Sequence, residues 1–531
     1  MQRRLGLALI VILLVTIGLL PILSMLIKSV MIEGHLSLEA YAGILTSSRQ
    51  WTLMGHSFAL SSLVTLLTVA VGLPLGVLLS KTDLPLRKTL GILFVIPLVI
   101  PPSIIAIAWS DLLGHGGLLA SLAGSWVAEV SSPLLFGLPG CVAILFSVFL
   151  PIPMLLTMVS LRTINPRLEE AGRLIAPWRG VLAEITFPLI LPGVLLSALL
   201  VFILTFGEFS VPNFLRYDVF PVETFTQFSA FYDFNAATAA AVPLAAVTLV
   251  LLVFEAVFLR DRTAQLRPSP DGDAVPLIEL GPSRNGVAAA VAVAACVIVL
   301  APILVLLIQS AGPAAYSEAL GKAGGALVRS LIYAAIGATL LSILGFFTGY
   351  LIHTRALRCW RSVDSLTIFL FALPGTVIGI GLISLWNTPW TNIIYGTPMI
   401  IILGYLAKYT ALTSRITATQ LAQIPPSMEE AAQVAGAGWF HRMVLIVGPL
   451  ARRGLIAGWL VAFVFSLRDT GITMLVYPAG HETLPVRIFT LMANGSPQLI
   501  AALCVLMILT TLVPPALVWL IPGLMTGKSV Q

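Results

Sequence analysis

The chain has 531 residues, of which 58% are hydrophobic and only 10% are charged. An average soluble domain carries roughly 25% charged residues, so a water-soluble fold is excluded. Its four cysteines lie far apart, without a CxxC pair or a nearby histidine, which argues against a disulfide framework and a zinc site. The formal net charge of +6 comes from basic residues in short loops between apolar runs. We therefore expect neither a metal site nor a nucleic-acid partner.

Windows of about 19 residues predict twelve membrane-spanning helices in an all-α integral membrane protein. The predicted spans begin near Leu5, Phe58, Leu90, Leu134, Leu189, Ala236, Val287, Leu331, Ser365, Ile393, Leu455 and Leu499. The first apolar run follows two arginines and imitates a signal peptide. Because it is too long for one and no small-x-small cleavage site follows, we expect it to be an uncleaved helix.

Basic residues are distributed unevenly among the predicted loops. If the N-terminus is cytoplasmic, 21 of the 29 lysines and arginines fall in inside loops, Lys81 among them, and 7 fall in outside loops. Inside loops of membrane proteins carry this excess of basic residues. The sequence therefore predicts a multi-pass protein of a cytoplasmic (inner) membrane with both termini in the cytoplasm.

The sequence also repeats itself. Ser57, Gly72 and Gly76 recur with unchanged spacing as Ser330, Gly345 and Gly349, and Pro97 with Trp109 recurs as Pro374 with Trp386. Six spans in each half give both copies the same orientation, so the repeat is parallel, and each GxxxG is expected to allow close helix packing. We expect a first module over 1–259, a charged, Pro- and Gly-rich cytoplasmic linker over 260–286, and a second module over 287–531.

Two long inside loops follow the fourth and tenth predicted spans. The first, over 165–188, begins NPRLEEAGR, and the second, over 425–449, begins PPSMEEAAQ. In the first loop Asn165 is expected to cap a short helix that starts at Pro166. In the second, Ser427 and Glu430 fit a capping box, and Gly436 is placed to end the helix. Each loop should therefore hold a short helix along the cytoplasmic face.

These loops resemble the EAA loops of the permease subunits of bacterial ABC importers, which read E-A-A-x-x-x-G before a hydrophobic stretch and a Leu-Pro-type pair. The second copy fits the pattern with Glu430, Ala431, Ala432, Gly436 and Pro449. The first matches at Glu170 and Ala171 but has Gly172 and Ala176 where the pattern has Ala and Gly. Two such loops in one chain resemble the fused ferric-iron and thiamine branch of these permeases.

The resemblance implies the fold of an ABC importer permease, with no catalytic residues and no ATPase site of its own. It implies docking of two copies of a separate ABC ATPase, which would hold ATP and Mg²⁺, and delivery of substrate by an extracytoplasmic binding protein. The residues implied in ATPase docking are Glu169, Glu170, Ala171, Ala176, Glu429, Glu430, Ala431 and Gly436. A sequence like a phosphate loop at 523–529 has one residue too few between its glycines, so we reject it.

Ferric iron is the first substrate that the resemblance implies. Thiamine, a phosphonate or another small solute carried by the same mechanism is an alternative, as is a secondary transporter with twelve helices. A major-facilitator transporter would carry an Asp-Arg-Gly-Arg-type signature between the second and third spans, where this chain has KTDLPLRK. A membrane enzyme would need a convergent catalytic set, but the six histidines are scattered and there is no HExxH motif.

Two outer segments, over 206–233 and 468–489, are too polar to cross lipid yet keep aromatic and apolar residues. They also resemble the ferric-iron and thiamine branch. We expect them to form an external gate and to meet the binding protein.

The repeat places one acid at the same point of each half, because Glu208 and Asp469 each lie 20 residues beyond a proline of the inside loop. A charge at membrane depth costs about 2.5 to 3.5 kcal/mol on insertion scales, which makes both acids candidates for lining the substrate pathway, facing each other, with Arg468 beside them. Two alternatives stay open. Arg468 could neutralise Asp469, or either acid could cap a broken helix.

Overall fold

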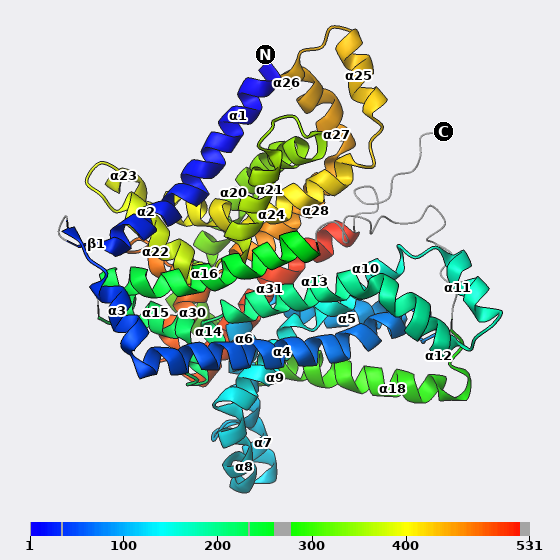
Figure 1. Cartoon of the computed structure of the whole chain (residues 1–531). Helices are drawn as coiled ribbons and strands as arrows, with labels where there is room; N and C mark the ends of the chain where they lie inside the picture. Colours follow the sequence, from blue (N-terminus) through cyan, green and yellow to red (C-terminus); the bar gives the residue numbers. More distant parts are fainter. Residues whose placement is uncertain (1, 33–34, 232–233, 260–277, 521–531) are drawn as a thin grey trace. The chain divides into compact units, whose positions relative to one another are not determined.

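The computed structural model describes residues 2–32, 35–231, 234–259 and 278–520 (Figure 1). In these ranges the chain is helical apart from loops and one antiparallel pair of two-residue strands, β1 (Met31–Ile32) and β2 (His35–Leu36). By length and composition, nine helical segments of the described chain could cross a membrane, or up to 11 if each of two bent pairs is one span. The all-α membrane fold is thus confirmed.

The number of spans is lower than the predicted twelve. The tenth predicted span corresponds to α24 (Met399–Leu421), which is long enough but less apolar because it carries Lys408 and Arg415. The third predicted span is interrupted, since α5 (Arg87–Val99) ends before α6 (Pro102–Leu113) begins.

The chain divides into two compact units, which do not follow the order of the sequence. Unit 1 holds residues 1–47, 224–245 and 312–531, and unit 2 holds 48–223 and 246–311. Each unit therefore consists mainly of one half of the repeat together with the first long helical run of the other half. The modules predicted over 1–259 and 287–531 describe the sequence repeat and stay a prediction.

The two units are built from short and long helices, several of them with a π-helical turn (η). Besides the elements already named, unit 2 contains α4 (Ser48–Lys81), α7 (Leu118–Ala123), α8 (Ser125–Leu135), α9 (Leu138–Phe149), α10 (Pro151–Leu161), α11 (Pro166–Arg173), α12 (Trp178–Val181), η2 (Leu182–Thr186), α13 (Phe187–Phe206), α14 (Ser210–Phe214), the 3₁₀ turn η3 (Gly281–Ser283), α18 (Arg284–Ala295), η4 (Cys296–Leu300) and α19 (Ala301–Gln309). Unit 1 contains α1 (Gln2–Leu14), η1 (Val15–Leu19), α2 (Leu20–Val30), α3 (Glu39–Thr46), α20 (Pro313–Thr354), α21 (Trp360–Ala372), α22 (Gly375–Trp386), α23 (Asn392–Tyr395), α25 (Pro426–Val434), α26 (Trp439–Arg442), η5 (Met443–Val447), α27 (Gly448–Leu450), α28 (Arg452–Leu467), α29 (Thr473–Val476), α30 (Leu484–Leu491) and α31 (Pro497–Leu520). The division between the units passes through α15 (Phe220–Ser229) and α16 (Phe234–Phe258).

A long helix with a GxxxG motif packs closely on a neighbour in each unit. In unit 2, a Cβ at Gly76 of α4 would lie 2.7 Å from the carbonyl oxygen of Met154 in α10. In unit 1, a Cβ at Gly349 of α20 would lie 2.6 Å from the carbonyl oxygen of Ser414 in α24. Only glycine allows the two backbones to approach this closely, so the predicted packing of both motifs is confirmed.

In each half, the long helix is followed by two shorter helices with a proline between them. Pro101 precedes α6 and Pro374 precedes α22, and α21 and α22 meet at 109°. The residue before a proline avoids the helical region, and Ile100 and Leu373 are both extended. The predicted repeat of this helix pair is confirmed. The pairing of Pro97 with Pro374 is wrong, because Pro97 lies inside α5 and Pro101 occupies the equivalent place.

Most of the predicted linker, residues 260–277, lies outside the described residues, as does the rejected phosphate-loop-like sequence at 523–529. The end of the linker is ordered against unit 2. Ile278 forms an isolated bridge with Thr82, and the backbone N–H of Leu280 donates to the Asp83 carboxylate at 3.0 Å. Arg284 pairs with Asp83 at 3.4 Å. Residues 278–286 are thus held at the turn between α4 and α5, which the expectation of a flexible linker missed.

Candidate functional site

The first inside loop forms the helix that its sequence predicts. The side chain of Asn165 accepts a hydrogen bond from the backbone N–H of Arg167 at 3.1 Å, and Pro166 is the first residue of α11. The cap and the start of the helix are confirmed. At the other end, the N–H of Ala176 donates to the carbonyl of Gly172 at 2.9 Å, and no residue of this loop, over 165–188, adopts a left-handed conformation.

The second inside loop also forms its helix, α25, but not through a capping box. Pro425 is the N-cap residue and Pro426 the first helical residue, so Ser427 lies inside the helix and no side chain caps it. The capping-box prediction is wrong, because two prolines already fix the backbone where the helix starts.

Gly436 ends α25 as predicted. Its φ is +87°, a left-handed conformation that favours glycine. Its N–H donates to the Gln433 carbonyl at 3.0 Å, and the N–H of Ala437 donates to the Ala432 carbonyl at 3.0 Å. These two bonds are the Schellman pattern that satisfies the last carbonyls of a helix.

The first glutamate of each loop helix points inward. In unit 2, Glu169 is 1% exposed, forms an ion pair with the fully buried Lys81 at the end of α4, and accepts a hydrogen bond from the Thr186 hydroxyl at 2.7 Å. In unit 1, Glu429 accepts hydrogen bonds from the Tyr350 hydroxyl at 2.9 and 3.2 Å, and the Arg442 guanidinium lies 3.5 Å away. These contacts fasten each loop helix to its own unit.

The second glutamate of each loop helix points outward. Glu170 and Glu430 are exposed, as are Ala171 and Ala431 beside them. Next to Glu430, a cavity of about 340 Å³ lies between α25 and the end of α20, with Tyr350, Glu429 and Gln433 among its lining residues. Large apolar side chains are also exposed on and just after these helices, at Leu174, Ile175, Met428 and Val434. An exposed acid among exposed apolar side chains is typical of a surface that another protein covers.

Sequence reasoning missed the partners of the inward glutamates. The sequence favours a basic loop residue at Lys81, but its side chain is fully buried. The glutamate doublet held a usable signal, because adjacent helical residues point about 100° apart and cannot both face the same surface. Nothing in the sequence pattern, however, indicated that Tyr350 or Arg442 would meet Glu429.

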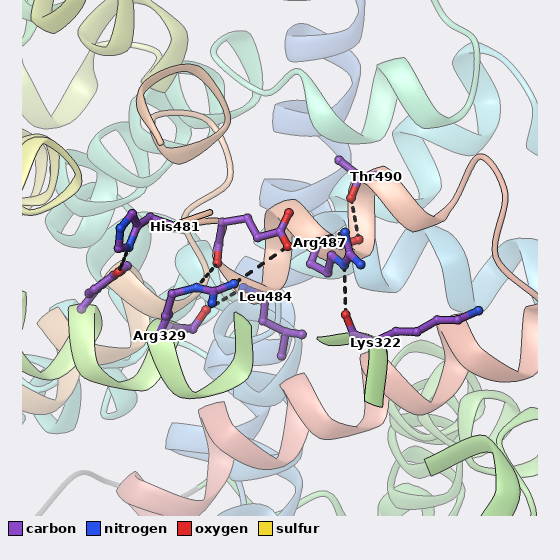
Figure 2. Close-up of polar contacts among 9 residues, drawn as sticks. Lys322, Arg329, His481, Leu484, Arg487 and Thr490 are labelled. Carbon is purple, nitrogen blue, oxygen red and sulfur yellow. Dashed lines mark hydrogen bonds and ion pairs between the residues drawn. The ribbon is translucent and has the colours of Figure 1, made fainter. Parts of the chain in front are cut away.

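The outer segment of unit 1 is clamped to α20 (Figure 2). Arg329 donates to the carbonyl oxygen of Glu482 at 3.1 Å, and the backbone N–H of Leu484 donates to the Ser330 hydroxyl at 2.6 Å. Arg487 pairs with the Glu482 carboxylate at 3.5 Å and donates to the carbonyl of Lys322 at 3.2 Å. The start of α30 is therefore fixed by side chains and backbone together.

Unit 2 repeats this clamp with different residues. His56 of α4 is hydrogen bonded to the carbonyl oxygen of Asp218 at 2.9 Å, and the backbone N–H of Phe220 donates to the Ser57 hydroxyl at 2.9 Å. Two consecutive residues of a long helix thus hold positions n and n+2 of the outer segment in both units. The recurrence of Ser57 as Ser330 is explained by this shared role.

The two acids of the outer segments cap short helices. Glu208 accepts hydrogen bonds from the backbone N–H of Ser210, at 2.8 Å, and from its hydroxyl, at the start of α14. Asp469 is buried and accepts from the backbone N–H groups of Ile472 and Thr473 at 3.0 and 3.1 Å, and from the Tyr409 hydroxyl at 2.7 Å. Arg468 lies over the ring of Phe465, 5.0 Å from its centroid. The alternative that each acid caps a broken helix is confirmed, and pathway lining stays a prediction.

Comparison with known proteins gives one consistent result. Residues 342–525 match the family described as "Binding-protein-dependent transport system inner membrane component". This stretch contains the second inside loop and its helix, α25. This match, together with the ferric transport permeases described next, supports a binding-protein-dependent ABC importer permease. The chain is a multi-pass protein of the inner membrane, and permeases of this family work with a substrate-binding protein and an ATPase.

Two ferric transport permeases are similar to this chain along most of its length, and other permeases match a shorter part of it. It is 23% identical to the putative ferric transport system permease protein FbpB 1 of Haemophilus influenzae, over 84% of this chain and 73% of that protein. It is 22% identical to the ferric transport system permease protein FbpB of Actinobacillus pleuropneumoniae, over 81% of this chain and 65% of that protein. The spermidine/putrescine permease PotC of H. influenzae is 26% identical over 35% of this chain.

Proposed function

We propose that this permease imports ferric iron and that α11 and α25 each dock one copy of a separate ABC ATPase. The orientation of the two glutamates in each helix is the observation that carries the docking proposal. The first glutamate is satisfied within its own unit, whereas the second is exposed among apolar side chains. Such a helix is fixed to its own unit through the first glutamate. The second glutamate is then available to bind a basic groove on a partner.

The firm attachment of each helix also suggests how force is transmitted. Lys81 is the last residue of α4, and Tyr350 lies in the last turns of α20, so each loop helix is joined to the long helix of its unit. ATP and Mg²⁺ bound between the two ATPase copies would drive their closure. Displacement of α11 and α25 would then move α4 and α20 as rigid bodies and change the access of the pathway.

The proposed orientation places both termini and both docking helices in the cytoplasm, as the excess of basic residues in alternate loops predicts. The clamped outer segments then face the other side of the membrane and meet the binding protein. Glu208 and Asp469 shape the outer end of the pathway by capping the breaks at which these segments start.

The substrate proposal rests on the ferric transport permeases, which are similar over more than four fifths of this chain. The polyamine permease and a putative 2-aminoethylphosphonate permease of Salmonella typhimurium match only about a third of it. A different small solute carried by the same mechanism is therefore the second candidate.

Reconstitution tests both parts of this proposal. The permease should be purified with its ATPase and placed in liposomes with its binding protein and ferric iron, thiamine, 2-aminoethylphosphonate or spermidine. We expect two ATPase copies per permease and stimulation of ATP hydrolysis by ferric iron alone. Stimulation by another solute would overturn the substrate, and a complex with no ATPase would overturn the docking role of α11 and α25.

A further inference from the structure

A groove on unit 1 lies beside η5, the turn that follows α25 and α26 in the chain, and has no part in the proposed coupling. Its volume is about 600 Å³, within the range of about 300 to 1,000 Å³ that ligand pockets occupy. Of its thirteen lining residues, only Ser342 and Trp459 carry a polar side-chain group. The walls come from α20, the turn η5, α28 and α31. Such a surface takes a hydrocarbon chain and no polar solute.

The groove is open to the surroundings of the unit. Val444, which lines it, is 51% exposed, and Phe440 at its edge is 64% exposed. The indole N–H of Trp459, a lining residue, donates to the Thr339 hydroxyl at 3.1 Å. This polar group is therefore already satisfied. In a membrane protein, an open apolar groove of this kind is in contact with lipid.

Two arginines lie at the end of the groove. The helical segments over 439–450 and 452–467 meet at 81°, and Arg452 and Arg453 are at this bend. Both are exposed, and within the described chain neither forms a hydrogen bond or an ion pair. Arg452 lies one turn before Leu455 and Ile456, which line the groove, so it shares their face of α28.

The position of these arginines favours an anion. They occupy the first turn of a 16-residue helix, where the helix dipole disfavours cations and attracts negative charge. A phosphate at the bend would pair with both guanidinium groups and relieve this unfavourable placement. The equivalent positions of the first half are Leu191 and Pro192, inside the unbroken helix α13. The charge pair is therefore particular to the second docking loop.

We infer that unit 1 binds one anionic phospholipid, with an acyl chain in this groove and the headgroup phosphate on Arg452 and Arg453. The lipid lies against η5 and α28, which connect the docking helix to the membrane. It fills the angle of the bend and supports the second loop, while the first loop has a continuous helix at that place.

Native mass spectrometry of the full-length permease in detergent tests this inference, with phosphatidylglycerol, phosphatidylcholine and inorganic phosphate as separate probes. We expect one phosphatidylglycerol to be retained. Arg452→Gln with Arg453→Gln should lower its affinity by about tenfold or more, since each arginine near a membrane surface attracts an anionic headgroup substantially. Val444→Trp should lower it as well by filling the groove while leaving both arginines in place.

The matched control is Arg358→Gln with Arg361→Gln, which removes two exposed arginines of the same unit away from the groove. Retention by this control should equal that of the unchanged protein. Equal loss in the control, unchanged retention in either groove variant, or displacement of the lipid by phosphate alone would overturn the inference. Lipid retention is measured without ATPase, binding protein or substrate, so this test is independent of the proposed transport function.

Discussion

The helix of each inside loop is fixed to its unit through an inward glutamate, but the partners of that glutamate differ between the two units. In unit 2 the inward glutamate of α11 meets Lys81 and Thr186, and in unit 1 that of α25 meets Tyr350 and Arg442. The long helix of each unit also supplies its donor from a different position. Tyr350 of α20 lies one turn before the position equivalent to Lys81 of α4. The comparison shows that the repeat keeps the glutamate doublet, with one member inward and one exposed, while the partner of the inward member can change.

The loops also differ in length by one residue, and the structure locates the difference. α25 has nine residues and α11 has eight, while the connection that follows each helix begins its next turn at a tryptophan, Trp439 or Trp178. The extra residue therefore lies in the docking helix itself. This explains why Glu170 is 18 residues from Pro188 while Glu430 is 19 from Pro449.

The largest expected difference between the loops concerns their buried contacts. Lys81→Met leaves the Glu169 carboxylate buried without its cation, and breaking a buried ion pair in this way destabilises a protein by about 3 to 5 kcal/mol. Tyr350→Phe should have a smaller effect, because Arg442 still faces Glu429. Thermal unfolding of the purified permease measures both.

The double variant Lys81→Met with Glu169→Met is the control for this comparison. Well-packed apolar replacements of both partners are often neutral or stabilising, so it should recover most of the lost stability. If Tyr350→Phe were as damaging as Lys81→Met, the two loops would depend equally on a single inward contact, contrary to the comparison.

The second-largest expected difference is in the loss of stability when each of the two capping acids, Asp469 and Glu208, is replaced. Asp469 is buried and accepts hydrogen bonds from two backbone N–H groups and from Tyr409, whereas Glu208 is half-buried and accepts only from Ser210 among the described residues. Hydrogen bonds to a charged group contribute about 1.5 to 3 kcal/mol, so Asp469→Asn should lower stability by about that much and Glu208→Gln by less. Unfolding and transport should be measured for each variant and for the pair.

These measurements also separate capping from pathway lining. A loss of transport without a loss of stability would support a direct role in the pathway. Full transport by the double variant would remove both acids from the mechanism.

The exposed glutamates provide a functional version of the comparison. Glu430→Lys should weaken copurification of the ATPase by about tenfold, or about 1.4 kcal/mol, because it places a cation where a basic groove is proposed. Glu170→Lys should weaken it less, since Glu430 also lines the cavity beside α25. Quantitative immunoblotting of the purified complexes compares the two, with Glu318→Lys, an exposed acid of α20, as control. Unchanged copurification and coupled hydrolysis in both variants would contradict the docking role.

Much of the fold could be predicted from the sequence because its physical causes are local. Apolar runs gave the long helices, and the spacing of Gly72 and Gly76 predicted close packing that depends only on those glycines. Asn165 and Gly436 act within their own helix ends. Tertiary contacts were harder to predict, since a buried lysine such as Lys81 resembles a loop lysine until its partner is known.

Errors arose where two local signals competed. Ser427 matched a capping box, but Pro425 and Pro426 set the start of α25 two residues earlier than that pattern requires. Pro97 and Pro101 are both possible helix breakers, and the sequence alone did not identify Pro101 as the one that ends α5. The roles of Ser57 and Ser330 needed the outer segments in place, because their partners lie more than 150 residues away.

The smallest expected difference between the loops lies at the ends of the two docking helices. Gly436 has a φ of +87°, so Gly436→Ala forces a Cβ into the left-handed region and should lower stability by about 1 kcal/mol. Ala176 has no such conformation, so Ala176→Gly gains nothing from the freedom of glycine and only adds chain entropy to the unfolded state. Gly436→Asn, which tolerates the left-handed conformation better, should fall between Gly436→Ala and the unchanged protein. A thermal unfolding temperature that is lowest for Gly436→Ala and intermediate for Gly436→Asn would show that the second loop needs a left-handed residue. Equal effects of Gly436→Ala and Ala176→Gly would refute this difference between the loops.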